Sequence, residues 1–185
     1  MVGSPTHTGS GALKFYGVNG NCPEAIYRND FDASIGEYSA WVNQTHVQAG
    51  FAFYVQTQLT GENLFGKDHY WVGCHASNGQ PPSGIWLGKR RDDVQEVLRF
   101  KTPSSFVLGE WVRAFIKIEP GGVITAGYQR QNGDLDTIMY VDPDPLTAPG
   151  KFIIMACADV YPTAHFFDDV CFNPCDHDGR HLRRR

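Results

Sequence analysis

Charged residues are scarce in this sequence, and long apolar runs are missing. Asp, Glu, Lys and Arg together make up only 19% of the 185 residues. No segment approaches the roughly 18–20 consecutive apolar residues that cross a bilayer, so we expect no membrane span. The opening MVGSPTHTGSG lacks a basic start followed by an apolar core, and we expect no signal peptide in the sequence as given.

Helical patterning is also scarce. Among segments longer than about ten residues, none repeats apolar residues convincingly at helical spacing. The segment DDVQEVLRF is compatible with a helix or with a strand. The chain is instead rich in Gly (20), Pro (11) and aromatic residues (13%), a composition that favours short strands joined by turns.

Strand-like segments follow one another at intervals of roughly 10–15 residues, with turn residues between them. The pairs Gly121-Gly122 and Asn132-Gly133 mark tight turns. The eleven predicted strands are 12–17, 37–43, 49–57, 68–75, 84–89, 94–100, 111–118, 122–129, 136–141, 151–157 and 164–172. So many strands without a helix predict an all-β fold, in which two antiparallel sheets stack as a jelly-roll sandwich.

The length of the chain predicts one domain. We assign residues 1–10 to a flexible N-terminus, 11–175 to the sandwich and 176–185 to a basic C-terminal tail. The formal net charge is −4, and subtracting the four Arg of the last six residues, RHLRRR, leaves −8 for the rest. An acidic body argues against a nucleic-acid partner for the folded domain, whereas the tail is either a disordered end or a contact for an anionic partner.

The cysteines contain no CxxC pair, which argues against a structural zinc site. If the terminal strands are neighbours, Cys22 could reach Cys171 or Cys175, and such a bridge would imply an oxidising compartment. We expect the fifth cysteine to be a buried free thiol, at Cys74 or at Cys157, since both lie in apolar surroundings.

Several segments, taken in order, resemble the concanavalin A-like lectin/glucanase superfamily, in particular its laminin-G-like and 3-keto-disaccharide hydrolase-like domains. The segments are GALKF from residue 11, SAWV from 39, AGFAFYV from 49, HYWV from 69, GEWVRAFIKI from 109, VITAGY from 123, GKFII from 150 and FDDVCF from 167. The resemblance covers nearly the whole chain, and it rests on the order of the segments. It implies a concanavalin A-like jelly roll, and it bears on fold more than on function.

Enzymes of the same fold remain alternatives. Glucanases of this superfamily carry a Glu-x-Asp-x-x-Glu strand, and this sequence has no such strand. The residue types used by polysaccharide lyases occur, but alginate-lyase signatures do not. A nucleophile elbow for Ser-His-Asp hydrolysis is missing as well. We therefore predict no catalytic residues and keep a lyase or a glycoside hydrolase as the alternative.

One carboxylate could bind a metal. In glucanases of this superfamily the last strand often supplies a calcium-binding Asp two residues before a core Val, and Asp168 stands in that position relative to Val170. The resemblance thus implies a structural calcium ion, which needs about six oxygen ligands. The alternative is that Asp168 caps a turn or pairs with an arginine.

Alternation with period two predicts which side chains face outward. Phe51, Phe53 and Val55 are expected to face the core, as are Tyr70, Val72, Cys74, Ile85 and Leu87. In GEWVRAFIKI the same alternation places Val112, Ala114, Ile116 and Ile118 on the core face. The predicted ligand-binding face consists of outward aromatic and polar residues, namely Tyr54, Gln56, His69, Trp71, Trp86, Arg90 and Arg113. Sugars stack on exposed rings beside polar groups. In the alternative interpretation, Trp71 and Trp86 close the ends of the sandwich under the Pro-rich loops.

Together these observations predict a carbohydrate-binding, lectin-like domain that recognises an oligo- or polysaccharide, in an extracellular location. The alternatives are a polysaccharide lyase or glycoside hydrolase of the same fold, and a structural or assembly protein built on a jelly roll. The sequence makes no prediction about the oligomeric state.

Overall fold

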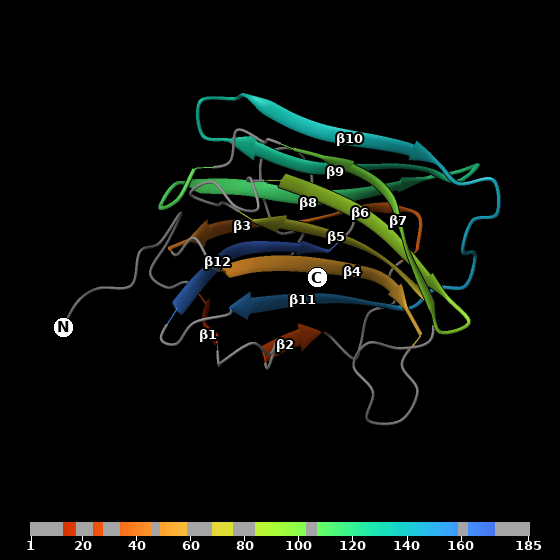
Figure 1. The fold of residues 1–185 in the computed structure, drawn as a ribbon, viewed down its shortest axis with the longest axis horizontal. Coiled ribbons are helices and arrows are strands. Elements are labelled where there is room, and N and C mark those ends of the chain that lie inside the picture. Colours follow the sequence, from red (N-terminus) through yellow and green to blue (C-terminus); the bar gives the residue numbers. More distant parts are fainter. Residues whose placement is uncertain are drawn as a thin grey trace, which may run out of the picture.

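The fold is built from two antiparallel β-sheets packed face to face (Figure 1). The computed structural model describes residues 13–17, 24–27, 34–45, 49–58, 68–75, 84–102, 107–158 and 163–172. Every regular element in these ranges is a strand, and there are twelve of them. In the part of the chain described here, therefore, no helix is available to span a membrane. The predicted all-β sandwich is confirmed.

Each sheet has six strands. Sheet I has the order β1 (Leu13–Gly17), β12 (Thr163–Phe172), β3 (Gly36–Gln44), β8 (Trp111–Glu119), β9 (Val123–Arg130), β10 (Leu135–Val141). Sheet II has the order β2 (Glu24–Tyr27), β11 (Lys151–Ala158), β4 (Ala49–Thr57), β5 (His69–His75), β6 (Gly84–Arg91), β7 (Val94–Lys101). Edge strands β10 and β7 lie on the same side of the sandwich, and they contact each other.

All eleven predicted strands are present, to within one or two residues at their ends. The strand that the sequence did not reveal is β2, because its four residues are too short to show alternation. The ambiguous segment DDVQEVLRF contributes most of β7, whose pairing with β6 shifts register between Leu87 and Gly88.

The core lies between the two sheets. Val112, Ala114 and Ile116 of β8 are fully buried, as the alternation predicts. From sheet II, Phe53, Tyr70 and Leu87 are also fully buried, and the other predicted inward residues of β4, β5 and β6 are buried with them. Period-two patterning therefore identified the inner face of both sheets correctly.

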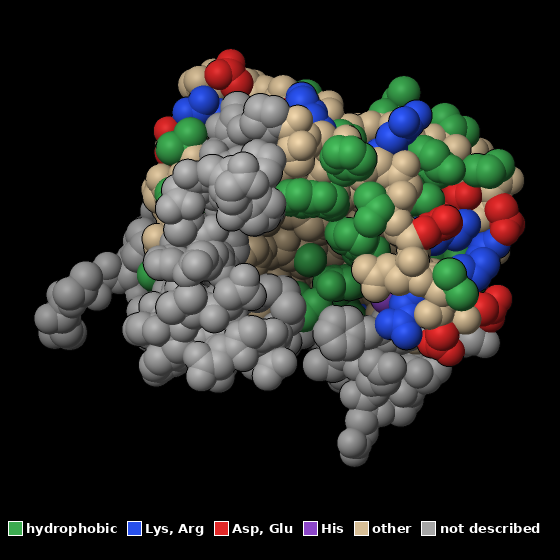
Figure 2. Space-filling view, in the orientation of Figure 1, with side chains coloured by type: hydrophobic (Ala, Val, Ile, Leu, Met, Phe, Trp, Pro, Cys, Tyr) green, Lys and Arg blue, Asp and Glu red, His purple; other side chains and the backbone are tan. Residues whose placement is uncertain are grey.

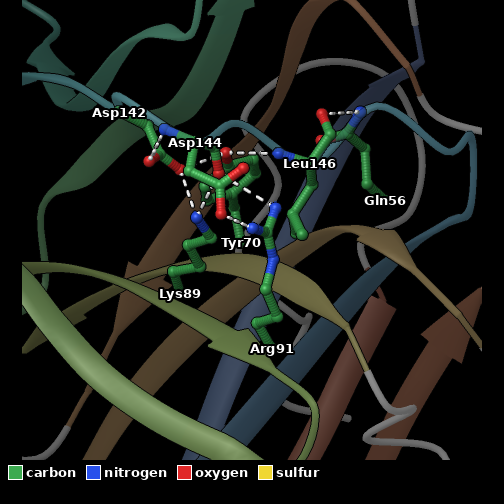
Figure 3. A network of polar contacts seen from close by, with 7 residues as sticks. All are labelled: Gln56, Tyr70, Lys89, Arg91, Asp142, Asp144 and Leu146. Carbon is green, nitrogen blue, oxygen red and sulfur yellow. Dashed lines mark hydrogen bonds and ion pairs between the residues drawn. The ribbon is translucent and has the colours of Figure 1, made fainter.

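One end of the sandwich is closed by residues 142–150, which run from β10 in sheet I to β11 in sheet II (Figure 1). A buried polar network holds this crossing (Figure 3). Lys89 Nζ lies 2.7 Å from Asp142 Oδ2, and both side chains are almost fully buried. The Tyr70 hydroxyl donates to the same oxygen at 2.6 Å and accepts from the Leu146 N–H at 2.9 Å. The network joins β5 and β6 to the crossing segment.

The prediction of a buried free thiol is confirmed for Cys74. Burial raises the pKa of this thiol far above its usual range. Other cysteine predictions fall outside the description: Cys22 and Cys175 are not among the described residues, and the side chain of Cys171 is not described. The same holds for the proposed flexible N-terminus, 1–10, and for the tail, 176–185.

Candidate functional site

The outer face of sheet II carries two tryptophans on neighbouring strands. Trp71 of β5 lies opposite Gly88 of β6, and Trp86 of β6 lies opposite Gly73 of β5. The two tryptophans are therefore diagonal neighbours, a relation in which the two Cα atoms are typically about 7–8 Å apart. Both side chains are partly exposed. They lie on the outer face of the sheet, and because the Pro-rich segment 76–83 is outside the described residues, the end-plug interpretation stays a prediction.

Glycines let both indoles lie close to the backbone. A Cβ atom added at Gly88 would overlap three ring atoms of Trp71, so this ring covers Gly88 on the next strand. A Cβ atom at Gly84 would stand 2.5 Å from the ring of Trp86 and 2.7 Å from a methyl group of Thr102. Real Cβ atoms do not approach other atoms so closely. The two glycines are therefore needed for these ring positions.

Apolar side chains extend the face on both sides of the tryptophans. Phe100 of β7 lies opposite Trp86 and is 66% exposed. On the other side, the partly exposed Tyr54 of β4 lies opposite Trp71. Ile153 of β11 lies opposite Tyr54 but is only 1% exposed, so the accessible surface ends at Tyr54. Figure 2 shows hydrophobic side chains gathered over the region of β5, β6 and β7, beside a hollow in the middle of the view. The result is a broad aromatic surface.

Polar hydrogen-bond donors lie among these rings. Arg90 stands two residues beyond Gly88 on β6, and its Nη2 reaches Asp93 at 3.1 Å. Its Nε–H and the Nε1–H of Trp71 are buried, and neither has a hydrogen-bond partner in the part of the chain that the structure describes. Buried donors normally have partners. An acceptor oxygen supplied by a ligand would satisfy these two.

Four of the seven predicted ligand-binding residues share this face: Tyr54, Trp71, Trp86 and Arg90. His69 is on the same strand face but is only 1% exposed, and its ring packs edge-on against Tyr54 with 5.1 Å between the ring centroids. His69 therefore supports the surface by packing against Tyr54. A direct contact of His69 with a ligand would need this packing to open.

The predicted exposure of Gln56 is wrong. Its side chain is 2% exposed and donates through Nε2 to the Leu146 carbonyl oxygen at 3.3 Å. The cause is a break in the alternation of β4. The pairing with β11 shifts register between Lys151 and Ile153, and Gln56 takes a left-handed backbone conformation with φ of 56°. A bulge of this kind turns a side chain away from its expected face.

The predicted position of Arg113 is also wrong. Its strand, β8, pairs with β3 and β9 in sheet I, so Arg113 lies on the opposite outer face of the sandwich. There its Nη2 contacts Glu37 Oε1 at 2.5 Å. Alternation within a strand shows which residues share a face, but it does not show which sheet the strand joins.

Asp168 lies on β12 in sheet I, opposite Trp41. Its Oδ1 accepts a hydrogen bond from the Asp169 N–H at 2.9 Å, next to a register shift in the strand. Among the described residues, no group of three or more His, Cys, Asp or Glu side chains could hold a metal ion. The described surroundings of Asp168 thus do not by themselves make a calcium site, and calcium at this residue stays a prediction.

The burial of the Tyr54 phenol, next to Trp71, can be tested through the pH dependence of stability. Burial raises the pKa of its phenol to about 12. The folded protein therefore holds this proton more tightly than the unfolded chain, whose tyrosine pKa is about 10. The resulting stability is fully present below about pH 10 and is lost as the pH rises through about 12.

We expect the free energy of unfolding to fall between pH 10 and 12, with Tyr54 contributing up to roughly 3 kcal/mol of the change. Tyr70 and Cys74, whose pKa values burial also raises, add to it. Urea denaturation at several pH values measures the slope. The variant Tyr54→Phe should have a shallower slope, and an unchanged slope would contradict the burial of this phenol.

Some residues of the face were not predicted from the sequence. Gly84 and Gly88 carry a usable signal, because glycine inside a strand marks a place where another group approaches the backbone closely. The position of the buried Ile153 beside Tyr54 had no such signal, since nothing in the sequence shows that β11 lies beside β4.

With two stacked six-stranded antiparallel sheets in this order, the protein has a concanavalin A-like jelly-roll fold, similar to that of solved lectins and glucanases. Similar solved structures include a β-glucanase from Bacillus licheniformis (12% identity, 88% of this chain and 78% of that chain covered, TM-score 0.59). A legume lectin-like domain from Entamoeba histolytica is also similar (11% identity, coverage 77% and 74%, TM-score 0.53). A third is CG-16, a homodimeric agglutinin from chicken liver (11% identity, coverage 78% and 100%, TM-score 0.50).

At these low sequence identities, the structural similarities show the fold alone. No family model matches the chain, and no curated protein matches its sequence.

Proposed function

We propose that the protein is a lectin-like, carbohydrate-binding protein that binds an oligo- or polysaccharide on the outer face of sheet II. The observation that carries the proposal is the pair of partly exposed indoles, Trp71 and Trp86, packed close against glycine positions of the sheet. Sugar rings stack their C–H faces on aromatic rings of this kind. The indole and guanidinium donors of Trp71 and Arg90 supply hydrogen bonds for sugar oxygens.

The similar structures support this proposal in a general way. Two of the three are called an agglutinin and a legume lectin-like domain. The third is a β-glucanase, so a hydrolase is the natural competing proposal.

The chemistry of the face favours binding over cleavage. Retaining glycoside hydrolysis needs two carboxyl groups about 5 Å apart across the scissile bond. The outward side chains that the structure describes on β4, β5 and β6 include no carboxylate; these positions carry glycine, alanine, Tyr54, His69, the two tryptophans and Arg90. A surface of this composition can hold a sugar, but its described residues offer no acid and no nucleophile for hydrolysis.

The test is a binding screen of the purified protein against a broad panel of polysaccharides, with new reducing ends and unsaturated uronates assayed in the same samples. We expect binding without cleavage. Trp71→Ala and Trp86→Ala should each weaken the affinity about tenfold, through loss of about 1–2 kcal/mol of stacking and burial. Trp41→Ala, which removes a partly exposed tryptophan of sheet I, should leave the affinity unchanged.

If both sheet II variants bind as tightly as the parent protein, the proposed face is wrong. Release of reducing ends or of unsaturated products would make the protein an enzyme. A lack of binding to every glycan, together with a large homo-oligomer in solution, would favour a structural role.

A further inference from the structure

A cavity of about 350 Å³ lies at the end of the sandwich that residues 142–150 cross. It is lined by Gln56, Gln58, Asp68, Arg91, Asp92 and residues 145–148. The cavity is separate from the tryptophan face, because neither Trp71 nor Trp86 lines it. Its volume is near the lower end of the range for small-molecule sites, which begins at about 300 Å³.

The amide and guanidinium side chains that line this cavity donate hydrogen bonds within the protein. Gln58 Nε2 donates to the Pro149 carbonyl oxygen at 2.7 Å, and Gln56 Nε2 donates to that of Leu146 at 3.3 Å. Arg91 pairs with the Asp144 carboxylate, and its Nη2 also donates to the Asp144 carbonyl oxygen at 2.9 Å (Figure 3). A ligand would therefore find these amide and guanidinium donors already engaged.

Two acceptor oxygens of the lining, by contrast, have no hydrogen-bond partner among the described residues. Gln56 Oε1 is buried and has no hydrogen-bond partner among the described residues. Asp68 accepts the Asp92 N–H at 2.9 Å through Oδ1, and its Oδ2 makes no hydrogen bond to a residue that the structure describes. A buried amide oxygen without a partner is costly. These acceptors favour a ligand group that donates hydrogen bonds.

The lining of the cavity is acidic among the residues that the structure describes. Asp68 and Asp92 are its described carboxylates, and Arg91, its one described cation, is paired with Asp144. Arg91 therefore does not neutralise the Asp68 carboxylate, which favours a cationic ligand.

We propose that this cavity binds a small molecule through a protonated primary amine, placed between Gln56 Oε1 and the Asp68 carboxylate. An ammonium group has three donors and no acceptor, which matches a site with spare acceptors and negative charge. The amine could belong to an amino sugar or to a simple alkylamine. The site does not depend on glycan binding at the tryptophan face.

Isothermal titration calorimetry at pH 6 and low ionic strength tests the ligand chemistry. The probes are glucosamine, glucose, N-acetylglucosamine, 1,4-diaminobutane and calcium chloride. We expect glucosamine to bind and the two neutral sugars not to bind. Equal affinity for 1,4-diaminobutane would identify the amine alone as the ligand, and weaker affinity would identify an amino sugar. Either result supports the proposal.

Variants locate the binding. Asp68→Asn keeps an acceptor for the Asp92 N–H but removes the charge, and it should weaken amine binding at least about tenfold. Asp93→Asn is the matched control, because Asp93 follows Asp92 in the turn between β6 and β7, pairs with Arg90 and does not line the cavity. Its affinity for the amines should be unchanged. Trp71→Ala should also bind amines normally, whatever it does to glycan binding.

Four results would overturn the proposal. These are binding of glucose as tight as that of glucosamine, binding of calcium alone, failure of both amines to bind, and unchanged amine binding by Asp68→Asn with the parent's thermal unfolding midpoint.

Discussion

Replacing Asp142 by alanine is expected to lower the free energy of unfolding by about 3–5 kcal/mol. The change leaves the buried Lys89 ammonium without its carboxylate and the Tyr70 hydroxyl without its acceptor. It also removes the Asp142 Oδ1 acceptor of the Asp144 N–H, so the segment that crosses the end of the sandwich loses its anchor. Urea denaturation followed by tryptophan fluorescence measures the loss.

Asp144→Ala is the matched control for this prediction. Asp144 is two residues away and also pairs with a cation of β6, but its side chain is 77% exposed. Exposed pairs contribute at most about 1 kcal/mol. The double variant Asp142→Asn with Lys89→Met removes both charges, and it should recover much of the stability that Asp142→Ala loses. Equal stability of the Asp142→Ala and Asp144→Ala variants would show that the buried pair is unimportant.

Gly88→Ala is expected to reduce glycan affinity by at least about tenfold, if the outer face of sheet II is the binding site. The added methyl group occupies the position of the Trp71 ring, so the indole must move away from the sheet. The displaced ring no longer shares a surface with Trp86. Because Gly88 faces away from the core, the cost in stability should stay within the roughly 1–3 kcal/mol typical of overpacking.

Gly73→Ala provides the comparison. Gly73 lies on the same face, opposite Trp86, but a Cβ atom there would come no closer than 3.4 Å to the Trp71 ring, an ordinary contact. This variant should fold and bind like the parent. If Gly88→Ala binds glycans as tightly as Gly73→Ala does, the close packing of Trp71 on the sheet is irrelevant to recognition.

Much of the fold could be predicted because it depends on local patterns. Alternation in β8 placed Val112, Ala114 and Ile116 in the core, and the Asn132-Gly133 pair marked the hairpin between β9 and β10. These features follow from the geometry of a strand and from the backbone freedom of glycine, which act within a few residues. Only the short β2 lacked such a pattern.

The candidate site was predictable in part, for the same reason. Trp71 and Trp86 lie on strands that are adjacent in sequence and paired in space, so their common face followed from alternation. Gln56 was misplaced because a bulge interrupts the alternation where β4 pairs with β11, a strand about 100 residues later in the chain. Arg113 was misplaced because strand pairing, which the sequence does not reveal, puts β8 in the other sheet.

The sequence by itself determined the all-β class, the strand positions, the inward residues and the pair of outward tryptophans, because each depends on neighbours within one strand or one turn. Tertiary structure alone decided the order of strands in each sheet, which ring covers each glycine and the burial of Gln56 and His69. It also decided the acceptor-rich cavity, whose residues come from β4, the start of β5, the β6–β7 turn and the segment before β11. Side chains so far apart in the chain meet only through long-range pairing of strands, and local sequence patterns carry no information about that pairing.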